Sequence, residues 1–527
     1  MSDGVVNRRV FIAGAVGALA ASGISASAPP PSVDELTLTD IGAAFAGGRF
    51  TAQQLTARYL ERIAASNRAG AALGAVLETN PRALAVAADL DRERRATGPR
   101  GPLHGVPVLI KDNVETADRM MTTAGSRALE GWYAPQDAPL VARLRAAGAV
   151  ILGKTNMSEW ANFRSTHASS GWSARGGQTR NPYALDRSPS GSSSGSAVAV
   201  SANWCAIAVG TETDGSIVSP ASVNGIVGLK PTVGLISRTG IIPISHSQDT
   251  AGPLTRSVRD AAIMLGVMAG ADTADAASNA AGGRFERDYV QFLDPQGLRG
   301  ARLGIARRFF ADNAPLDRHL DHCIGLLEGA GAVLVDPADL PPQETAAAAE
   351  QIVLLYEFKA GLNAYLARLP DGFPVRSLDQ LIRFNESHAA IEMPLFDQEL
   401  LRQAAAKGGL QEAAYRDARA ACLAATRADG IDAVLAAHQL DALVTLTSGT
   451  AWLIDPVNGD SDPGGCSSPA AIAGYPHITV PAGLHRGLPV GLSFFGTAFS
   501  EPKLLRLASG FEHVANGRAI PRLLANI

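Results

Sequence analysis

The sequence has few cysteines and little net charge. Four cysteines occur in 527 residues, and no two of them form a C-x-x-C pair. So low a number excludes a disulfide-rich scaffold. The 46 basic and 50 acidic residues leave a net charge of −4. A nucleic-acid-binding protein would carry a basic patch, so we expect a globular protein without nucleic-acid partners.

The sequence contains no recognisable metal-binding motif and only a few lysines. The ten histidines form no H-E-x-x-H motif, and no cluster of cysteine and histidine suggests a metal, so we expect neither a metal nor another cofactor. Only six of the 46 basic residues are lysine: Lys111, Lys154, Lys230, Lys359, Lys407 and Lys503. Arginine is therefore the usual cation of this chain, and each lysine raises the question of why arginine would not serve there.

Long hydrophobic runs are missing beyond the first residues. The N-terminus has Arg8-Arg9-x-Phe-Ile, a short apolar run and Ala26-x-Ala28, the pattern of a cleavable signal. The arginine pair resembles a twin-arginine signal, which exports folded proteins. We predict a signal peptide over 1–28, no stable membrane anchor after cleavage, and a mature chain in the periplasm or outside a bacterial cell. The alternative is a retained anchor, for which the run is short and rich in glycine and alanine.

Residues 29–527 alternate between short apolar runs and segments of helical periodicity, which predicts a single α/β domain. The expected strands are 106–110, 149–152, 206–209, 225–229, 302–305, 332–335, 442–446, 477–480 and 490–495. The main expected helices are 36–65, 81–95, 138–147, 196–202 and 502–514. Residues 270–435 are mostly helix-like, and we interpret them as an elaboration of the sheet that shapes the substrate site.

Two familiar motifs occur in the wrong structural context. The stretch 148–155 (G-A-V-I-L-G-K-T) matches a phosphate loop, but its apolar centre predicts a buried strand whose N–H groups bind neighbouring strands. The stretch 191–195 (G-S-S-S-G) matches a nucleophile elbow centred on Ser193, which needs a strand before the serine. A turn-forming stretch stands there instead. An α/β-hydrolase with His246 or His513 as the base remains an alternative.

A third signal combines a lysine with two serines. Lys111 ends an apolar run, Ser192 lies in the glycine- and serine-rich loop, and Ser216 follows another apolar run. A serine hydroxyl needs an adjacent base to act as a nucleophile. A lysine amine can be that base when burial keeps it neutral, whereas arginine stays protonated. These three residues are therefore candidates for nucleophilic catalysis.

The segments that carry these residues resemble the amidase signature family. The matching segments are 105–113, 122–126, 147–156, 188–197, 210–216, 225–232, 473–483 and 487–491. The resemblance covers nearly the whole mature chain and is thinnest between about 270 and 435. It implies one large amidase domain with a mixed central β-sheet covered by helices on both faces.

The resemblance also implies a role for each candidate residue. Ser216 would be the nucleophile, Ser192 a bridging serine that follows a cis Gly191–Ser192 peptide bond, and Lys111 the base. The backbone N–H groups of Thr213, Asp214, Gly215 and Ser216 would form the oxyanion hole. The acyl-enzyme on Ser216 would then be cleaved by water.

Two positions depart from the usual family pattern. The family commonly has T-D-T-G-G-S where this chain has T-E-T-D-G-S at 211–216, so that a carboxylate, Asp214, stands near the oxyanion. Val218 replaces the arginine that usually follows the nucleophile by two residues. This version of the motif resembles the peptide amidase branch, which removes C-terminal amides from peptides.

We therefore expect an amidohydrolase that cleaves a carboxamide C–N bond, with a small-molecule or peptide amide as substrate. The alternatives are an aryl-acylamide, ester or carbamate hydrolase, an amidotransferase subunit, or an inactive binding protein on the same scaffold. Substrate choice is expected to involve the helical region and the loop 445–468, which carries Trp452, Asp455, Asp460 and Cys466. The sequence predicts no particular oligomeric state.

Overall fold

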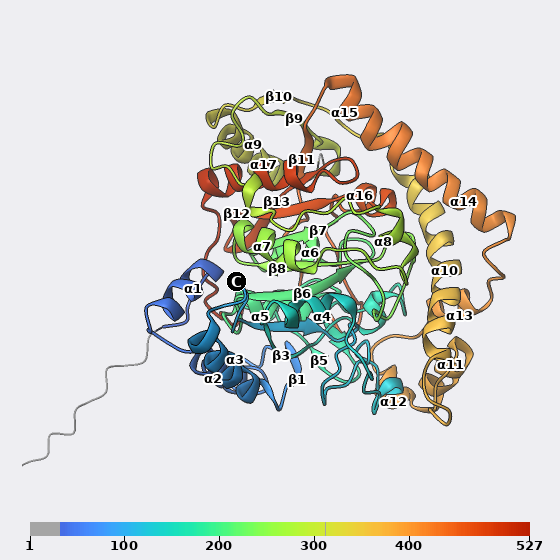
Figure 1. Cartoon of the computed structure of the whole chain (residues 1–527). Coiled ribbons are helices and arrows are strands. Elements are labelled where there is room, and N and C mark those ends of the chain that lie inside the picture. Colours follow the sequence, from blue (N-terminus) through green and yellow to red (C-terminus); the bar gives the residue numbers. More distant parts are fainter. Residues whose placement is uncertain (1–31, 311) are drawn as a thin grey trace, which may run out of the picture. The chain divides into compact units, whose positions relative to one another are not determined.

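The computed structural model describes residues 32–310 and 312–527 (Figure 1). The predicted signal segment 1–28 lies outside the described residues. Within the described ranges no helix is long and apolar enough to cross a membrane. Residues Val33–Ile527 form one unit, and the description below concerns that unit.

One sheet of eleven strands runs through the unit, in the order β1-β3-β2-β6-β8-β7-β12-β13-β11-β9-β10. Strands β3, β2 and β6 are parallel, as are β11, β9 and β10, and all other neighbours are antiparallel. The sheet is therefore mixed, as expected. The bounds are β1 Val76–Thr79, β2 Pro107–Lys111, β3 Val150–Thr155, β6 Ile207–Glu212, β7 Val227–Lys230, β8 Thr250–Thr255, β9 Arg302–Ile305, β10 Val333–Val335, β11 Ala442–Leu446, β12 His477–His485 and β13 Leu488–Phe495. Strands β4 (Trp172–Ser173) and β5 (Gly177–Gln178) form a separate pair.

All of the expected strands occur, and two further strands of the main sheet, β1 and β8, were not predicted. Strand β8 reads T-A-G-P-L-T and lacks the β-branched run typical of strands. It forms nonetheless because β6 and β7 both pair with it. The expected helix 36–65 is two helices, α1 (Leu38–Ala46) and α2 (Ala52–Ser66), because Gly47-Gly48 ends the first and a Thr51 capping box begins the second.

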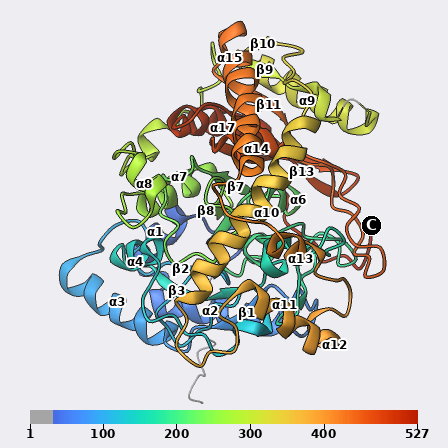
Figure 2. The ribbon, with the colours of Figure 1, turned by 90° about the vertical axis from the view of Figure 1, so that its right-hand side faces the viewer.

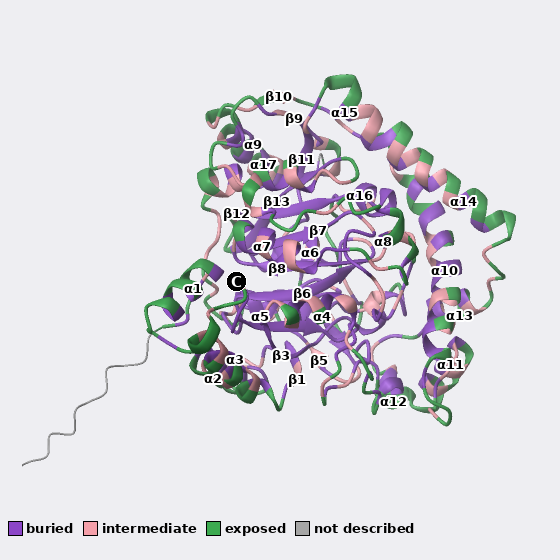
Figure 3. Ribbon diagram, viewed as in Figure 1, coloured by how far each residue is buried: buried purple, intermediate pink, exposed green. Residues whose placement is uncertain are grey.

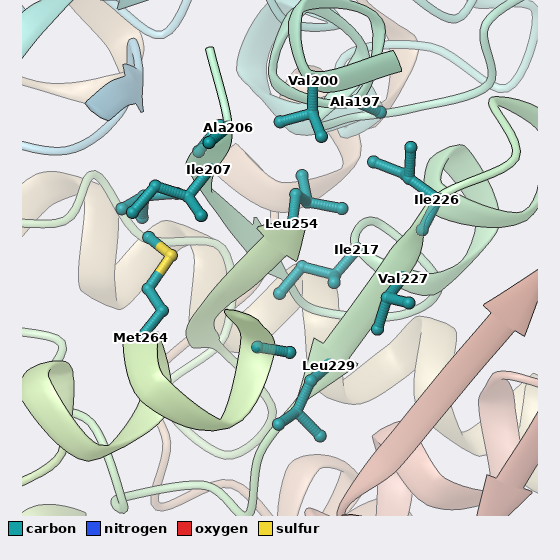
Figure 4. Close-up of a cluster of buried hydrophobic side chains, with 14 of the residues drawn as sticks. Ala197, Val200, Ala206, Ile207, Ile217, Ile226, Val227, Leu229, Leu254 and Met264 are labelled. Atoms are coloured by element: carbon teal, nitrogen blue, oxygen red, sulfur yellow. The ribbon is translucent and has the colours of Figure 1, made fainter. Parts of the chain in front are cut away.

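Helices cover both faces of the sheet. Ile207 and Leu254 lie on opposite faces, since Leu254 is paired with Ala208, the neighbour of Ile207. Figure 4 shows Met264 approaching from one side and Val200 from the other. These two residues belong to α7 (Val258–Met268) and α5 (Ser194–Ser201). The strands between them are buried throughout (Figure 3). The other helices that contact the sheet include α2, α3 Ala83–Thr97, α6 Val218–Val223, α9 Ala314–Gly329 and α17 Glu501–Ala515, while α4 Pro139–Ala146 packs against α7, and α16 Ser468–Ala473 packs against α14.

The region 341–438 forms a helical layer along one side of the unit (Figures 1 and 2). Its longest helix, α10 (Glu344–Ala367), packs along α14 (Ala413–Leu423). The remaining members are α11 Leu378–Ser387, α12 Ala389–Glu392, α13 Glu399–Ala405 and α15 Asp432–His438, and α8 Ala276–Ala280 precedes the layer in the chain. Within 341–410, all of which the structure describes, there is no strand, as predicted.

A buried arginine fastens this helical layer to the rest of the unit. Arg164 and Glu159 form an ion pair with no exposed side-chain surface. Arg164 also donates to the backbone oxygen of Glu392 in α12 (2.5 Å) and lies over the ring of Phe396 (4.1 Å). The Glu392 carboxylate in turn accepts hydrogen bonds from Ser126 Oγ and the backbone N–H of Arg127. The positive charge of Arg164 also lowers the pKa of the Glu392 carboxyl group, so one guanidinium acts on two neighbouring carboxyl groups.

Removing this cation should destabilise the protein far more than removing a surface one. Burial raises the pKa of Glu159, and the charge of Arg164 opposes that shift. We expect Arg164→Met to lower the free energy of unfolding by about 3–5 kcal/mol, because a buried carboxyl pair loses its counter-charge. Urea unfolding followed by circular dichroism measures the loss.

The matched control is Arg402→Met. Arg402 pairs with Asp397 and Glu386, but all three side chains are exposed. Exposed ion pairs of this kind contribute about 0–1 kcal/mol to the free energy of unfolding. Equal losses in the two variants would contradict the proposed role of Arg164.

Candidate active site

The candidate residues lie where two parallel strands end. Val108 of β2 is paired with Ile207 of β6, and Ile110 with Val209. Lys111 is the last residue of β2, and the loop 213–217 follows β6. The carboxyl ends of parallel strands meet at one edge of a sheet, so strand register alone brings the lysine beside this loop.

Lys111 Nζ contacts three oxygens and is shielded from solvent. It lies 2.8 Å from Ser192 Oγ, 3.0 Å from Ser193 Oγ and 3.0 Å from the backbone oxygen of Thr211. The side chain is fully buried. The predicted partner Ser192 is thus in direct contact with the lysine, and Ser193 is a contact that the sequence did not predict.

The hydrogen bonds around Lys111 suit a neutral amine. Ser193 Oγ donates to Thr211 O (3.0 Å) and accepts from Thr211 N (3.2 Å), so towards Lys111 it can only accept. A neutral amine has two N–H groups, which Thr211 O and Ser193 Oγ can accept. Its lone pair is then left for the hydroxyl proton of Ser192.

Burial also favours the neutral form of this amine. Desolvation lowers the pKa of Lys111 to about 7, although the carboxylates of Glu212 and Asp249 act in the opposite direction. A large fraction of Lys111 is therefore unprotonated at neutral pH, which a base requires.

The loop after β6 presents Ser216 and several free N–H groups. Gly215 has φ +74°, and a Cβ there would lie 3.0 Å from Ser467 Oγ, so both its conformation and its surroundings require glycine. No residue of 32–310 or 312–527 accepts a hydrogen bond from the backbone N–H of Asp214, Gly215 or Ser216. Such donors are suited to an oxyanion.

Two contacts hold this loop in place. Glu212 Oε2 accepts the N–H groups of Ile217 (2.7 Å) and Val218 (3.0 Å) at the start of α6. The Ser193 N–H donates to Ser216 O (3.2 Å).

The Gly191–Ser192 peptide bond is cis, as the resemblance implied. Among these described residues no hydrogen bond joins the hydroxyls of Ser192 and Ser216.

The carboxyl group of Asp214 is bound to a helix start. Its Oδ1 accepts from Ser467 Oγ (2.5 Å), immediately before α16. Burial raises the pKa of Asp214, while the hydrogen bonds from Ser467 and Ser468 and the charge of Lys230 lower it. The expected carboxylate next to the oxyanion loop is therefore present, with partners of its own.

Ser216 opens into a cavity of about 470 Å³ with an acidic lining. Asp214, Asp460 and Asp462 line it, and no lysine or arginine does. Trp452 Nε1 donates to Asp460 Oδ1 (2.8 Å), and the Ser170 N–H donates to Asp460 Oδ2 (2.9 Å). The cavity is thus polar and negatively charged.

The loop 445–468 places two of its four named residues at this cavity. Trp452 and Asp460 line the cavity, whereas Asp455 and Cys466 do not. Asp455 accepts the N–H groups of its own surface turn. Cys466 is buried, with its Sγ 3.9 Å from His477 Nε2.

The helical region 270–435 contributes no residue to this cavity. Whether that region shapes the substrate site in another way stays a prediction. Arg164 connects the helical layer to the cavity indirectly. It donates a hydrogen bond to α12, and the next residue in the chain, Ser165, lines the cavity.

The two motif matches that sequence context rejected fail in the structure as well. Residues 150–155 are strand β3, buried throughout, so no phosphate loop exists there. Residues 188–192, directly before Ser193, are not a strand, which a nucleophile elbow would require. No group of three or more histidine, cysteine, aspartate or glutamate residues that could hold a metal occurs in the described part of the chain.

Several site residues carry no clear signal in the sequence. Trp160, Ala161 and Asn162 have left-handed φ values of 49°, 55° and 69°, although none of them is glycine. Ala161 and Asn162 line the cavity. Asn113 and Ser193 lie inside the recognised segments 105–113 and 188–197, so their positions could have suggested them.

Comparisons with known proteins find relatives that cover most of this chain. A family model described as Amidase matches residues 54–505. The solved structure of native peptide amidase from Stenotrophomonas maltophilia is 54% identical, with a TM-score of 0.89 over 94% of this chain and all of that one. A probable amidase of Arabidopsis thaliana is 45% identical over 94% of this chain and 93% of that protein. A putative amidase of Schizosaccharomyces pombe is 36% identical over 94% of this chain and 88% of that protein.

The scarcity of lysine makes the titration of Lys111 measurable. With lysine labelled at Cε, only six side-chain signals arise. We expect the Lys111 signal to titrate with a pKa of about 7 because the amine is desolvated. Lys154 and Lys230, which are also buried, should titrate at about 8. Single Lys→Met variants assign the signals, and a Lys111 that stays protonated to about pH 9 would exclude it as a neutral base.

Proposed function

The chain belongs to the amidase family, and we propose that it hydrolyses the C-terminal amide of peptides through Ser216, Ser192 and Lys111. The observation that carries this proposal is the 2.8 Å contact between the buried Lys111 amine and Ser192 Oγ. It pairs a hydroxyl with a base whose lone pair has no other partner. Ser216, in the loop after β6, lines the large acidic cavity.

The reaction begins with Ser216 Oγ attacking the amide carbonyl carbon. Ser192 takes the proton of Ser216 and passes its own to the neutral amine of Lys111. The proton then returns through Ser192 to the amide nitrogen, the C–N bond breaks, and ammonia leaves. Water cleaves the resulting ester on Ser216, which yields the carboxylate and restores the serine.

The oxyanion would be held by backbone N–H groups of the loop 213–216. The unpartnered donors of Asp214, Gly215 and Ser216 support this assignment. A single oxyanion donor is worth roughly 3–4 kcal/mol of transition-state stabilisation in comparable enzymes. The bond from Ser467 to Asp214 supports the same conformation of the loop.

The charge of the cavity supports a carboxamide substrate. A C-terminal amide is neutral, whereas the hydrolysed peptide ends in a carboxylate. Asp214, Asp460 and Asp462 would repel that carboxylate. Peptides that lack the amide would therefore bind poorly, and the product would be expelled. The 54% identity to a peptide amidase supports the same substrate class.

A panel of substrates tests both the chemistry and the specificity. We expect the highest kcat/KM for peptide amides, lower values for anilides, esters and carbamates, and lower values again for peptide amides with acidic residues before the amide. The kcat/KM should rise with pH through about 7, because only neutral Lys111 accepts a proton. Ser216→Ala should lower kcat by at least about 10³-fold and abolish labelling by a fluorophosphonate.

The matched control is Ser165→Ala, which removes another hydroxyl from the lining of the same cavity. It should keep turnover within a few-fold of the wild type. Near-normal turnover by Ser216→Ala would refute the mechanism. A preference for esters or anilides would leave the mechanism intact and refute the peptide-amide assignment.

We further propose that the protein is exported by a twin-arginine-type signal. The support is the sequence of residues 1–28, with Arg8, Arg9 and the Ala26-x-Ala28 exit. Expressed in a bacterium with a twin-arginine translocase, the full chain should appear in the periplasm in a shortened form. The double variant Arg8→Lys/Arg9→Lys should retain it at full length in the cytoplasm. Cytoplasmic localisation of both forms would overturn this proposal.

A further inference from the structure

A second, very small cavity lies behind the bridging serine. It holds about 10 Å³ and is lined by Ser192 but not by Ser216. Ala161 lines both this cavity and the large acidic one, so the two adjoin at that residue. The other lining residues are Asn113, Thr211, Glu212, Thr213, Ile241, Ile242, Ile244, Asp249 and Thr250.

Two of these residues have a buried oxygen without a partner. They are Oδ1 of Asn113 and Oε1 of Glu212. The two side chains are 3% and 1% exposed. Their other polar atoms are already used, since Asn113 Nδ2 donates to Thr211 Oγ1 (3.0 Å) and Glu212 Oε2 caps α6. Buried acceptors are nearly always satisfied, so this pair requires a donor that the described residues do not supply.

The size of the cavity limits what that donor can be. A cavity of about 10–15 Å³ admits one molecule of the size of water. Ile241, Ile242 and Ile244 form apolar walls and leave no room for a larger group. A molecule with one heavy atom and several hydrogens, water or ammonia, fits both the volume and the two acceptors.

We propose that this cavity, which we call the amine pocket, receives the ammonia released from the substrate. The proposal rests on the proposed function. The C–N bond breaks as Ser192 returns the proton of Ser216 to the nitrogen, so the nitrogen departs next to Ser192 Oγ. The ester to Ser216 forms in the same step, and neutral ammonia is the only other product. Asn113 Oδ1 and Glu212 Oε1 accept its hydrogens.

The amine pocket explains why primary amides would be preferred. A substituent on the departing nitrogen, such as a methyl group, a second residue or an aryl ring, would have to occupy space that the isoleucines fill. An internal peptide bond would be refused for the same reason. The specificity would therefore reside on the leaving-group side of the triad, whereas the acidic cavity holds the acyl side.

Enlarging the amine pocket tests this assignment. We expect Ile242→Ala and Ile244→Ala to raise the ratio of kcat/KM for a peptide N-methylamide to that for the primary amide by at least about tenfold. A ratio is insensitive to the fraction of folded enzyme. The control is Leu355→Ala, which is buried in the same hydrophobic cluster but lines neither cavity, and should leave the ratio unchanged.

A crystal structure of the resting enzyme supplies a readout that does not depend on turnover. One water or ammonium within hydrogen-bond distance of both Asn113 Oδ1 and Glu212 Oε1 is expected, and an empty amine pocket would overturn the proposal. An unchanged ratio in both isoleucine variants, with normal turnover of the primary amide, would overturn it while leaving the proposed function standing. Absence of turnover on every primary amide would refute the proposed function and the assignment together.

Discussion

The desolvation of one amine at the end of strand β2 is the constraint on which the site depends. Lys111 can act as a base only while no water and no close carboxylate restores its proton. Its three contacts are two serine hydroxyls and a backbone oxygen. The parallel pairing of β2 with β6 sets that environment, because it aligns the end of one strand with the loop after the other. The fold therefore prepares the chemistry before any substrate binds.

Two other buried lysines show how much the surroundings matter. Lys154 donates to the backbone oxygen of Val114 and to Thr122 Oγ1, with the Asp112 carboxylate near by. Lys230 lies among the carboxyl groups of Glu212, Glu501 and Asp214. Burial lowers the pKa of both amines, and carboxylates oppose the shift, as Glu212 and Asp249 do at Lys111. The three equally buried lysines therefore differ in their contacts, and only Lys111 contacts the hydroxyls of the serine-rich loop.

Much of this arrangement could be predicted from sequence because it depends on local pattern. Apolar runs bounded by glycine and proline predicted the strands on which Lys111 and the loop 213–217 depend. Strand β8 could not be predicted, since only its neighbours make T-A-G-P-L-T a strand. The contact of Ser193 with Lys111 and the unpartnered oxygen of Asn113 arise from tertiary packing. The spacing of residues along the sequence does not predict such contacts. The left-handed turn at 160–162 was equally hidden, because its residues include no glycine.

The contacts of Arg164 also suggest how the substrate preference of this enzyme could change during evolution. Arg164 holds α12 on one side and continues into the lining of the acidic cavity through Ser165 on the other. The helical layer lines no part of that cavity. A shift of α12 would nevertheless displace Arg164 and, with it, the neighbouring Ser165 in the cavity wall. Sequence change in a region that lines no part of this cavity could then alter which substrates fit, while the strands that carry Lys111 and the loop 213–217 remain as they are.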